Sequence, residues 1–165
     1  MKKILTIMLI ATISIMASWD IGKVVTVIDG DTIMLKKQSG EVIKCRLVGL
    51  DTFETKVNHR TFKQLETLKL IHPFKKHSIK EVLFWGYQAK TFVADRILNK
   101  EINYHAYKLD QYGRLLIYIK NLNYALIRTG LAVQYPTNLL HPKRKAFLLQ
   151  ASREANLEKR GFYAK

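Results

Sequence analysis

Acidic side chains gather in one stretch of a chain that is otherwise strongly basic. Five of the thirteen Asp and Glu residues fall within positions 27–54, among them Asp31, Asp51 and Glu54. Carboxylates on neighbouring strands repel one another unless a positive charge lies among them. That charge can be a bound metal ion, which suits clustered oxygen ligands, or the guanidinium of Arg46 in the same stretch. The spacing therefore predicts a site of ionic chemistry here.

The elements that must position these residues are short strands. Alternating apolar residues and turn signals predict strands over 22–28, 32–37, 42–50, 101–107 and 115–120. Asp29, which precedes a glycine, is typical of a turn between the first two strands. Helical spacing and end signals predict three helices, over 86–98, over 121–129 and from Pro142 to Gly161. Five strands in this order favour a small closed or partly open barrel, in an α+β fold with a mainly β core.

Length and charge narrow the class of protein. The 165 residues suffice for one domain with a substantial core. The formal net charge of +15 points to nucleic acid or another polyanion as partner, against the plainer interpretation of a merely soluble basic protein. Cys45 is the only cysteine, which excludes an intramolecular disulfide and predicts a small, buried apolar side chain.

The first residues have the pattern of an export signal. Lys2 and Lys3 precede a largely apolar run over 4–16, and the small residue Ala17 follows. The run is short for a membrane span, which needs roughly 20 residues. We therefore expect 1–17 to be a cleaved signal peptide, with no stable membrane insertion after cleavage. The domain of 18–165 would then be exported, to the periplasm or beyond the cell.

One basic segment, over about 56–84, fits no single predicted element. A solvated loop or irregular helix and a basic arm that follows a phosphate backbone remain equally good interpretations. A metal site built from its histidines His59, His72 and His77 is disfavoured, because their spacing matches no helix face.

Three sequence blocks, taken in order, resemble one family. "VIDGDTIML", "RLVGLDTFET" and "DQYGR" are similar to the conserved blocks of the thermonuclease, or staphylococcal nuclease-like, family, and the resemblance continues through "WGYQAKTF" and "ALIRTGLA". It covers 23–161 apart from the basic segment, and it implies a five-stranded barrel of the oligonucleotide-binding type with three helices. Two features depart from the family. Phe53 stands where a proline is usual, and the segment from Thr55 to Trp85 is some twenty residues longer than the family pattern.

The resemblance also implies roles for individual residues. Asp31 and Asp51 would hold Ca²⁺ together with the backbone carbonyl of Thr52, and such sparse, oxygen-only ligation suits weak binding of a hard cation. Glu54 would act as the general base that orients or deprotonates the attacking water.

Two arginines would bind the phosphate that is cleaved. Arg46 and Arg114 correspond to the catalytic arginines of the family, and a guanidinium matches two phosphate oxygens at once. The structural alternatives are an ion pair of Arg46 with Glu41 or Asp51, and a turn-stabilising pair of Arg114 with Asp110.

Three further residues are candidates for substrate contacts. Tyr112 and Tyr135 could stack on bases or contact phosphate, although ordinary packing explains them nearly as well. Lys56 of the basic segment could supply electrostatic affinity.

The sequence thus predicts a secreted, monomeric, calcium-dependent nuclease. It would hydrolyse phosphodiester bonds of DNA and RNA with little sequence specificity and give 3′-phosphorylated products, as the resemblance implies. The main alternative is a non-catalytic nucleic-acid-binding module on the same barrel, and a basic cell-surface adhesin is a third.

Overall fold

Five strands close into a barrel that carries the rest of the molecule. The computed structural model describes residues 19–164, so the predicted signal peptide lies outside the described residues. The strands are β1 (Asp20–Val27), β2 (Thr32–Lys37), β3 (Val42–Leu47), β5 (Glu101–Leu109) and β6 (Leu115–Tyr118). Their order around the barrel is β1-β2-β3-β6-β5, and only β3 and β6 run parallel. The predicted five-stranded barrel is therefore confirmed.

The prediction that the third strand extends over 42–50 is wrong at its end. It stops at Leu47, and Gly49 adopts a φ of 80°, a left-handed conformation that turns the chain out of the barrel. The next residues form β4 (Leu50–Thr52), which pairs with β7 (Ala132–Gln134) in a separate two-stranded sheet. This departure carries Asp51 away from the barrel wall.

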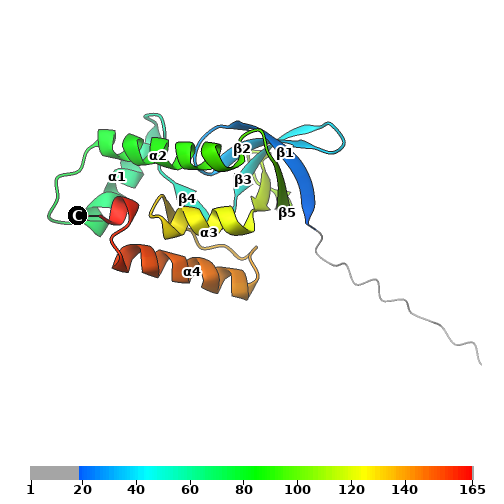
Figure 1. Ribbon diagram of the computed structural model, residues 1–165. Coiled ribbons are helices and arrows are strands. Elements are labelled where there is room, and N and C mark those ends of the chain that lie inside the picture. Colours follow the sequence, from blue (N-terminus) through cyan, green and yellow to red (C-terminus); the bar gives the residue numbers. More distant parts are fainter. Residues whose placement is uncertain (1–18, 165) are drawn as a thin grey trace, which may run out of the picture.

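Within residues 19–164 the structure has four α-helices, one more than predicted. They are α1 (His59–Ile71), α2 (Ile79–Ile97), α3 (Lys120–Arg128) and α4 (Pro142–Leu157), and a 3₁₀ turn, η1 (Gly161–Tyr163), follows α4. The additional helix α1 and the first turns of α2 come from the basic segment that sequence reasoning left unplaced. Figure 1 shows α2, α3 and α4 arranged in a stack at one side of the barrel, with α1 behind α2. Within 19–164, no helix is both long and apolar enough to span a bilayer.

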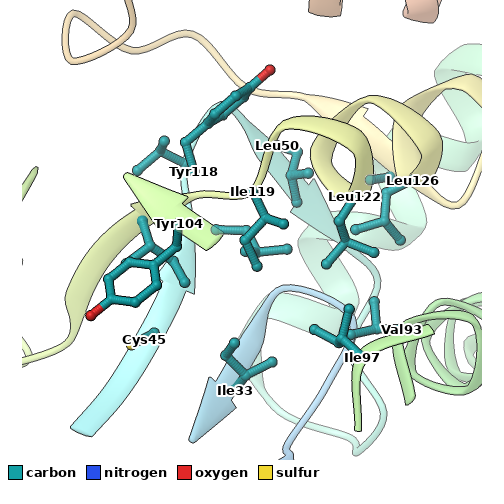
Figure 2. Close-up of a cluster of buried hydrophobic side chains, with 14 of the residues drawn as sticks. Ile33, Cys45, Leu50, Val93, Ile97, Tyr104, Tyr118, Ile119, Leu122 and Leu126 are labelled. Atoms are coloured by element: carbon teal, nitrogen blue, oxygen red, sulfur yellow. The ribbon is translucent and has the colours of Figure 1, made fainter. Parts of the chain in front are cut away.

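The barrel and the helices share one apolar core. Figure 2 shows Ile33 and Cys45 from the strands facing Val93 of α2 and Leu126 of α3. Cys45 is fully buried, as predicted, and burial raises the pKa of its thiol to about 12. The thiol is therefore a packing group and not a nucleophile.

A second, smaller core holds α1 in place. It joins α1, α2, α4 and η1, and its buried members are Phe53, Leu68, Val82, Ala155, Phe162 and Tyr163. The ring of Phe53 packs edge-on against the ring of Phe162, with centroids 5.1 Å apart. The helix α1 is thus a docked part of the fold and not a loose arm.

Candidate active site

The turn before β2 places Asp31 in the interior. Asp29 stays in the turn, where its Oδ1 accepts the backbone N–H of Asp31 at 3.1 Å, as expected for a turn residue. Asp31 is buried, its Oδ1 accepts the Thr32 hydroxyl at 2.9 Å, and its Oδ2 accepts the Thr52 N–H at 3.1 Å. The carboxylate therefore ties the start of β2 to the end of β4.

Burial dominates the electrostatics of Asp31. Loss of hydration raises the pKa of this carboxyl from 3.8 to about 7, although the neighbouring Arg46 pulls it down. An ionised carboxylate here needs more positive charge than the protein itself places beside it.

Arg46 bridges the two aspartates. It projects from β3, with Nη1 2.5 Å from Asp31 Oδ1 and Nη2 2.5 Å from Asp51 Oδ1. Burial opposes its charge, but the two carboxylates outweigh that effect and raise the pKa of Arg46, so it remains a cation. Of its two predicted structural partners, Asp51 is present and Glu41 is not, since Glu41 pairs with Lys37.

Gln64 of α1 fixes the backbone on both sides of Phe53. Its Nε2 donates to the Thr52 carbonyl at 2.8 Å, and its Oε1 accepts the Glu54 N–H at 2.8 Å. Gln64 is only 8% exposed, which keeps these hydrogen bonds out of water. The loss of the family's proline at 53 is therefore offset by two anchors, the Gln64 amide and the buried Phe53 ring.

A close backbone contact adds a third anchor from α2. A Cβ at Gly86 would lie 2.2 Å from the carbonyl oxygen of Glu54, so only glycine allows the helix to approach this loop. The Glu54 side chain itself remains accessible at 19% exposure, and its Oε2 accepts a hydrogen bond from Asn58 at 2.8 Å.

A third arginine enters the site from α1. Arg60 places Nη2 2.5 Å from Asp51 Oδ1 and Nη1 3.2 Å from Glu54 Oε1. It reaches these carboxylates because Asn58 caps the helix with its side chain and starts α1 right after the Glu54 loop. Arg46 and Arg60 thus share the same oxygen of Asp51.

Arg114 approaches from the turn between β5 and β6. Its Nη2 lies 2.7 Å from Asp110 Oδ2, which is the turn-stabilising pair foreseen as the structural alternative. The guanidinium carbon also lies 5.3 Å from the ring centroid of Tyr112, a residue that is 73% exposed. Arg114 itself is 18% exposed, about as much as Arg46 at 15%, so its guanidinium is largely buried beside the exposed ring of Tyr112.

These elements enclose a cleft of about 510 Å³. One wall is a face of α1 with Arg60, Lys63, Gln64 and Thr67, at helical spacing. The cleft is also lined by the β5–β6 turn and by the segment after β7. Other lining residues are Arg46, Asp51, Thr52, Tyr112, Arg114 and Tyr135.

The structure brings together most of the residues singled out from the sequence. Asp31 lies behind Arg46 and Thr52 through the hydrogen bonds described above, and Glu54 lies beside Arg60. Tyr135 is 60% exposed, so neither tyrosine belongs to the core. Lys56 is exposed and is not among the residues that line the cleft. Gln64 was missed, and the only signal for it was its spacing of four residues from Arg60.

Metal-binding side chains are sparse in this region. Among residues 19–164, no cluster of three or more His, Cys, Asp and Glu side chains has the arrangement of a metal site. The two aspartates with the Thr52 carbonyl nevertheless form an oxygen-only donor set, which is the chemistry that a hard cation prefers.

Comparisons with known proteins give one family and one relative for this chain. The family described as "Staphylococcal nuclease homologue" matches residues 44–165, a range that begins after Asp31. The uncharacterized protein MJ1439 of Methanocaldococcus jannaschii is 32% identical over 154 residues, covering 86% of this chain and 70% of that protein.

Proposed function

The chain belongs to the staphylococcal nuclease homologue family, and from this premise we propose that it is an exported, calcium-dependent nuclease. It would hydrolyse phosphodiester bonds of DNA and RNA with little sequence preference and leave 3′-phosphorylated ends. The observation that carries the proposal is the meeting of Asp51, Arg46 and Arg114 in one cleft, where Arg60 of the same cleft links Asp51 to Glu54.

The donor set supports a calcium site. Asp31, Asp51 and the Thr52 carbonyl would hold the ion, and the cost of ionising the buried Asp31 is the kind of cost that a bound cation removes. When bound, Ca²⁺ would neutralise charge on the phosphate and help to orient it. With two carboxylates and one carbonyl, the affinity of the free protein should be weak.

The arginines supply the recognition of phosphate. Arg46 and Arg114 line the same cleft, and each offers a planar fork of N–H donors. Negative charge grows on the phosphoryl oxygens as water adds to phosphorus, so these hydrogen bonds strengthen toward the transition state. Glu54 would accept the proton of the attacking water, since its carboxylate is accessible beside Arg60 and sits on a loop anchored by Gln64.

The walls of the cleft support a broad substrate range. Tyr112 and Tyr135 are exposed aromatic rings, which stack on any base. Substrate attraction would come from the charge of the mature domain, which is the +15 of the full chain less Lys2 and Lys3, and which acts on phosphate irrespective of sequence. Export rests on the sequence pattern of residues 1–17 alone, and we propose a periplasmic or secreted monomer.

The competing proposal is a binding module without catalysis, and one experiment separates the two. The purified protein is incubated with DNA and with RNA, with Ca²⁺ or with a chelator, alongside the Glu54→Gln variant. A nuclease cleaves both substrates only with Ca²⁺, loses most of its rate in the variant, and leaves ends that a polymerase extends only after dephosphorylation. Binding without cleavage in Ca²⁺ would establish the module instead.

A further inference from the structure

Arg60 is the one guanidinium of the site that comes from the basic segment. It lies on α1, within the part of the chain that is longer than the family pattern, and it faces the cleft together with Lys63 and Gln64. Its ion pairs go to Asp51 and to Glu54. One partner is a proposed metal ligand and the other is the proposed general base.

Arg60 is paired with two carboxylates that the proposed reaction would use differently, Asp51 to hold the cation and Glu54 to activate water. Arg46 is 15% exposed and is held by Asp31 as well as Asp51, whereas the Arg60 side chain is 45% exposed. Any cation that binds Asp51 must compete with Arg60 for the same carboxylate oxygen. The more exposed arginine is the one that can leave, because less packing holds it.

A released Arg60 remains at the wall of the cleft. Its backbone is fixed, because α1 is capped by Asn58 and anchored through the buried Leu68 in the second core. From that position the freed guanidinium faces the space where the phosphates of a bound strand would lie, and it offers a third planar fork beside those of Arg46 and Arg114.

We propose that Arg60 is a substrate-binding residue that exchanges partners. In the free protein it neutralises Asp51 and Glu54, and in the complex it contacts a phosphate of the nucleic acid. The proposal rests on the proposed function, since it assigns a cation and a phosphodiester substrate to this cleft. A cation that displaces Arg60 from Asp51 frees the side chain for phosphate. Binding of the cation should therefore strengthen binding of the substrate, and the reverse.

The exchange predicts opposite effects of one substitution on two ligands. In Arg60→Ala, Ca²⁺ alone should bind about threefold or more tightly than in the wild type, because a competing positive charge has left Asp51. With Ca²⁺ present, a nucleoside 3′,5′-bisphosphate should bind about tenfold more weakly, because one charge-assisted contact is lost. Both affinities are measured by calorimetry on the full domain.

A matched variant controls for charge on the same helix. Lys69→Ala also removes one positive charge from α1, but Lys69 pairs with Glu66 and does not line the cleft. It should change either affinity by less than about twofold, since exposed charges at a distance are screened. Arg60→Gln keeps part of the aliphatic stem and a polar end but removes the charge, and it replaces the alanine variant if that one does not fold.

Two outcomes overturn the proposal. Calcium affinity that is unchanged or weaker in the Arg60 variant would make Arg60 a structural anchor of α1, and unchanged nucleotide affinity would remove it from the substrate site. Cleavage of DNA by the wild type is recorded in the same buffers. A wild type that binds the bisphosphate but does not cleave would overturn the nuclease and leave the partner exchange standing.

Discussion

Replacing Asp31 by asparagine should make the metal-free protein more stable while it removes activity. The carboxyl is buried, and burial raises its pKa from 3.8 to about 7. Asparagine has nearly the same shape and carries no charge. The variant therefore keeps the packing and avoids the cost of an ionised, dehydrated group.

The magnitude follows from the pKa shift. About three pKa units at 1.36 kcal/mol each correspond to about 4 kcal/mol between the charged and neutral forms. The asparagine NH₂ group must face one of the N–H or O–H donors that surround Asp31, which takes back about 1–3 kcal/mol. We expect a net gain of about 1–3 kcal/mol above pH 7, or a rise in melting temperature of roughly 5 °C.

The effect of Asp31→Asn on stability should depend on pH. Because the folded-state pKa is the higher one, the wild type loses stability as the pH rises from about 4 to about 7, while the variant does not. The gain should thus be full above pH 7. Near pH 4 only the cost of the asparagine NH₂ group remains, so the variant should be less stable than the wild type there by about 1–3 kcal/mol. Adding Ca²⁺ should stabilise the wild type and leave the variant unchanged.

Thermal and denaturant unfolding in chelator, at pH 4, 6 and 8, test this prediction. Asp95→Asn, the same change at an exposed position on α2, is the control and should shift stability by less than about 0.5 kcal/mol. An Asp31 variant that is less stable than the wild type at pH 8 would show that the hydrogen bonds of this carboxylate outweigh its dehydration.

The remaining predictions concern activity. Arg46→Lys and Arg114→Lys should each lower kcat by about a hundredfold or more with the fold intact, since lysine keeps the charge but not the fork; a loss within threefold would make that arginine structural. Gln64→Ala should lower kcat about tenfold with little change in KM, because the loop of Glu54 loses its amide anchor; an equal loss of stability with unchanged kcat would refute a positioning role. Lys63→Ala should flatten the salt dependence of DNA binding by about one phosphate contact, and an unchanged slope in a salt titration would place the strand elsewhere.

The barrel could be predicted because its strands follow simple rules. Residues 32–37 begin with β-branched and aliphatic residues between two turn signals, and they form β2 with the predicted bounds. The proximity of Asp31 and Arg46 also follows from the strand order, since Thr32 pairs with Arg46 across β2 and β3. The local sequence pattern and the pairing of adjacent strands were therefore sufficient to predict that Asp31 and Arg46 lie close together.

The helix α1 could not be predicted, because its pattern of burial contradicts the usual periodicity. Its buried face includes the polar residues Thr61 and Gln64, whereas Phe62 is 56% exposed and Leu70 is 84% exposed. Apolar residues therefore do not mark the inner face. The pairing of Arg60 with Asp51 depends on the orientation of this helix, so no local signal could reveal it.

The contact between Phe53 and Phe162 has a consequence for the time at which the candidate site is completed during synthesis. These two residues lie more than a hundred positions apart, yet their rings pack together beside the Glu54 loop. A ribosome adds roughly 5–20 residues per second, so several seconds pass between the synthesis of the two rings. During that interval the growing chain already holds its first strands but lacks the residue that completes the packing of the loop. If the chain is the nuclease proposed above, it should therefore be unable to attack the RNA that encodes it while it is still under synthesis.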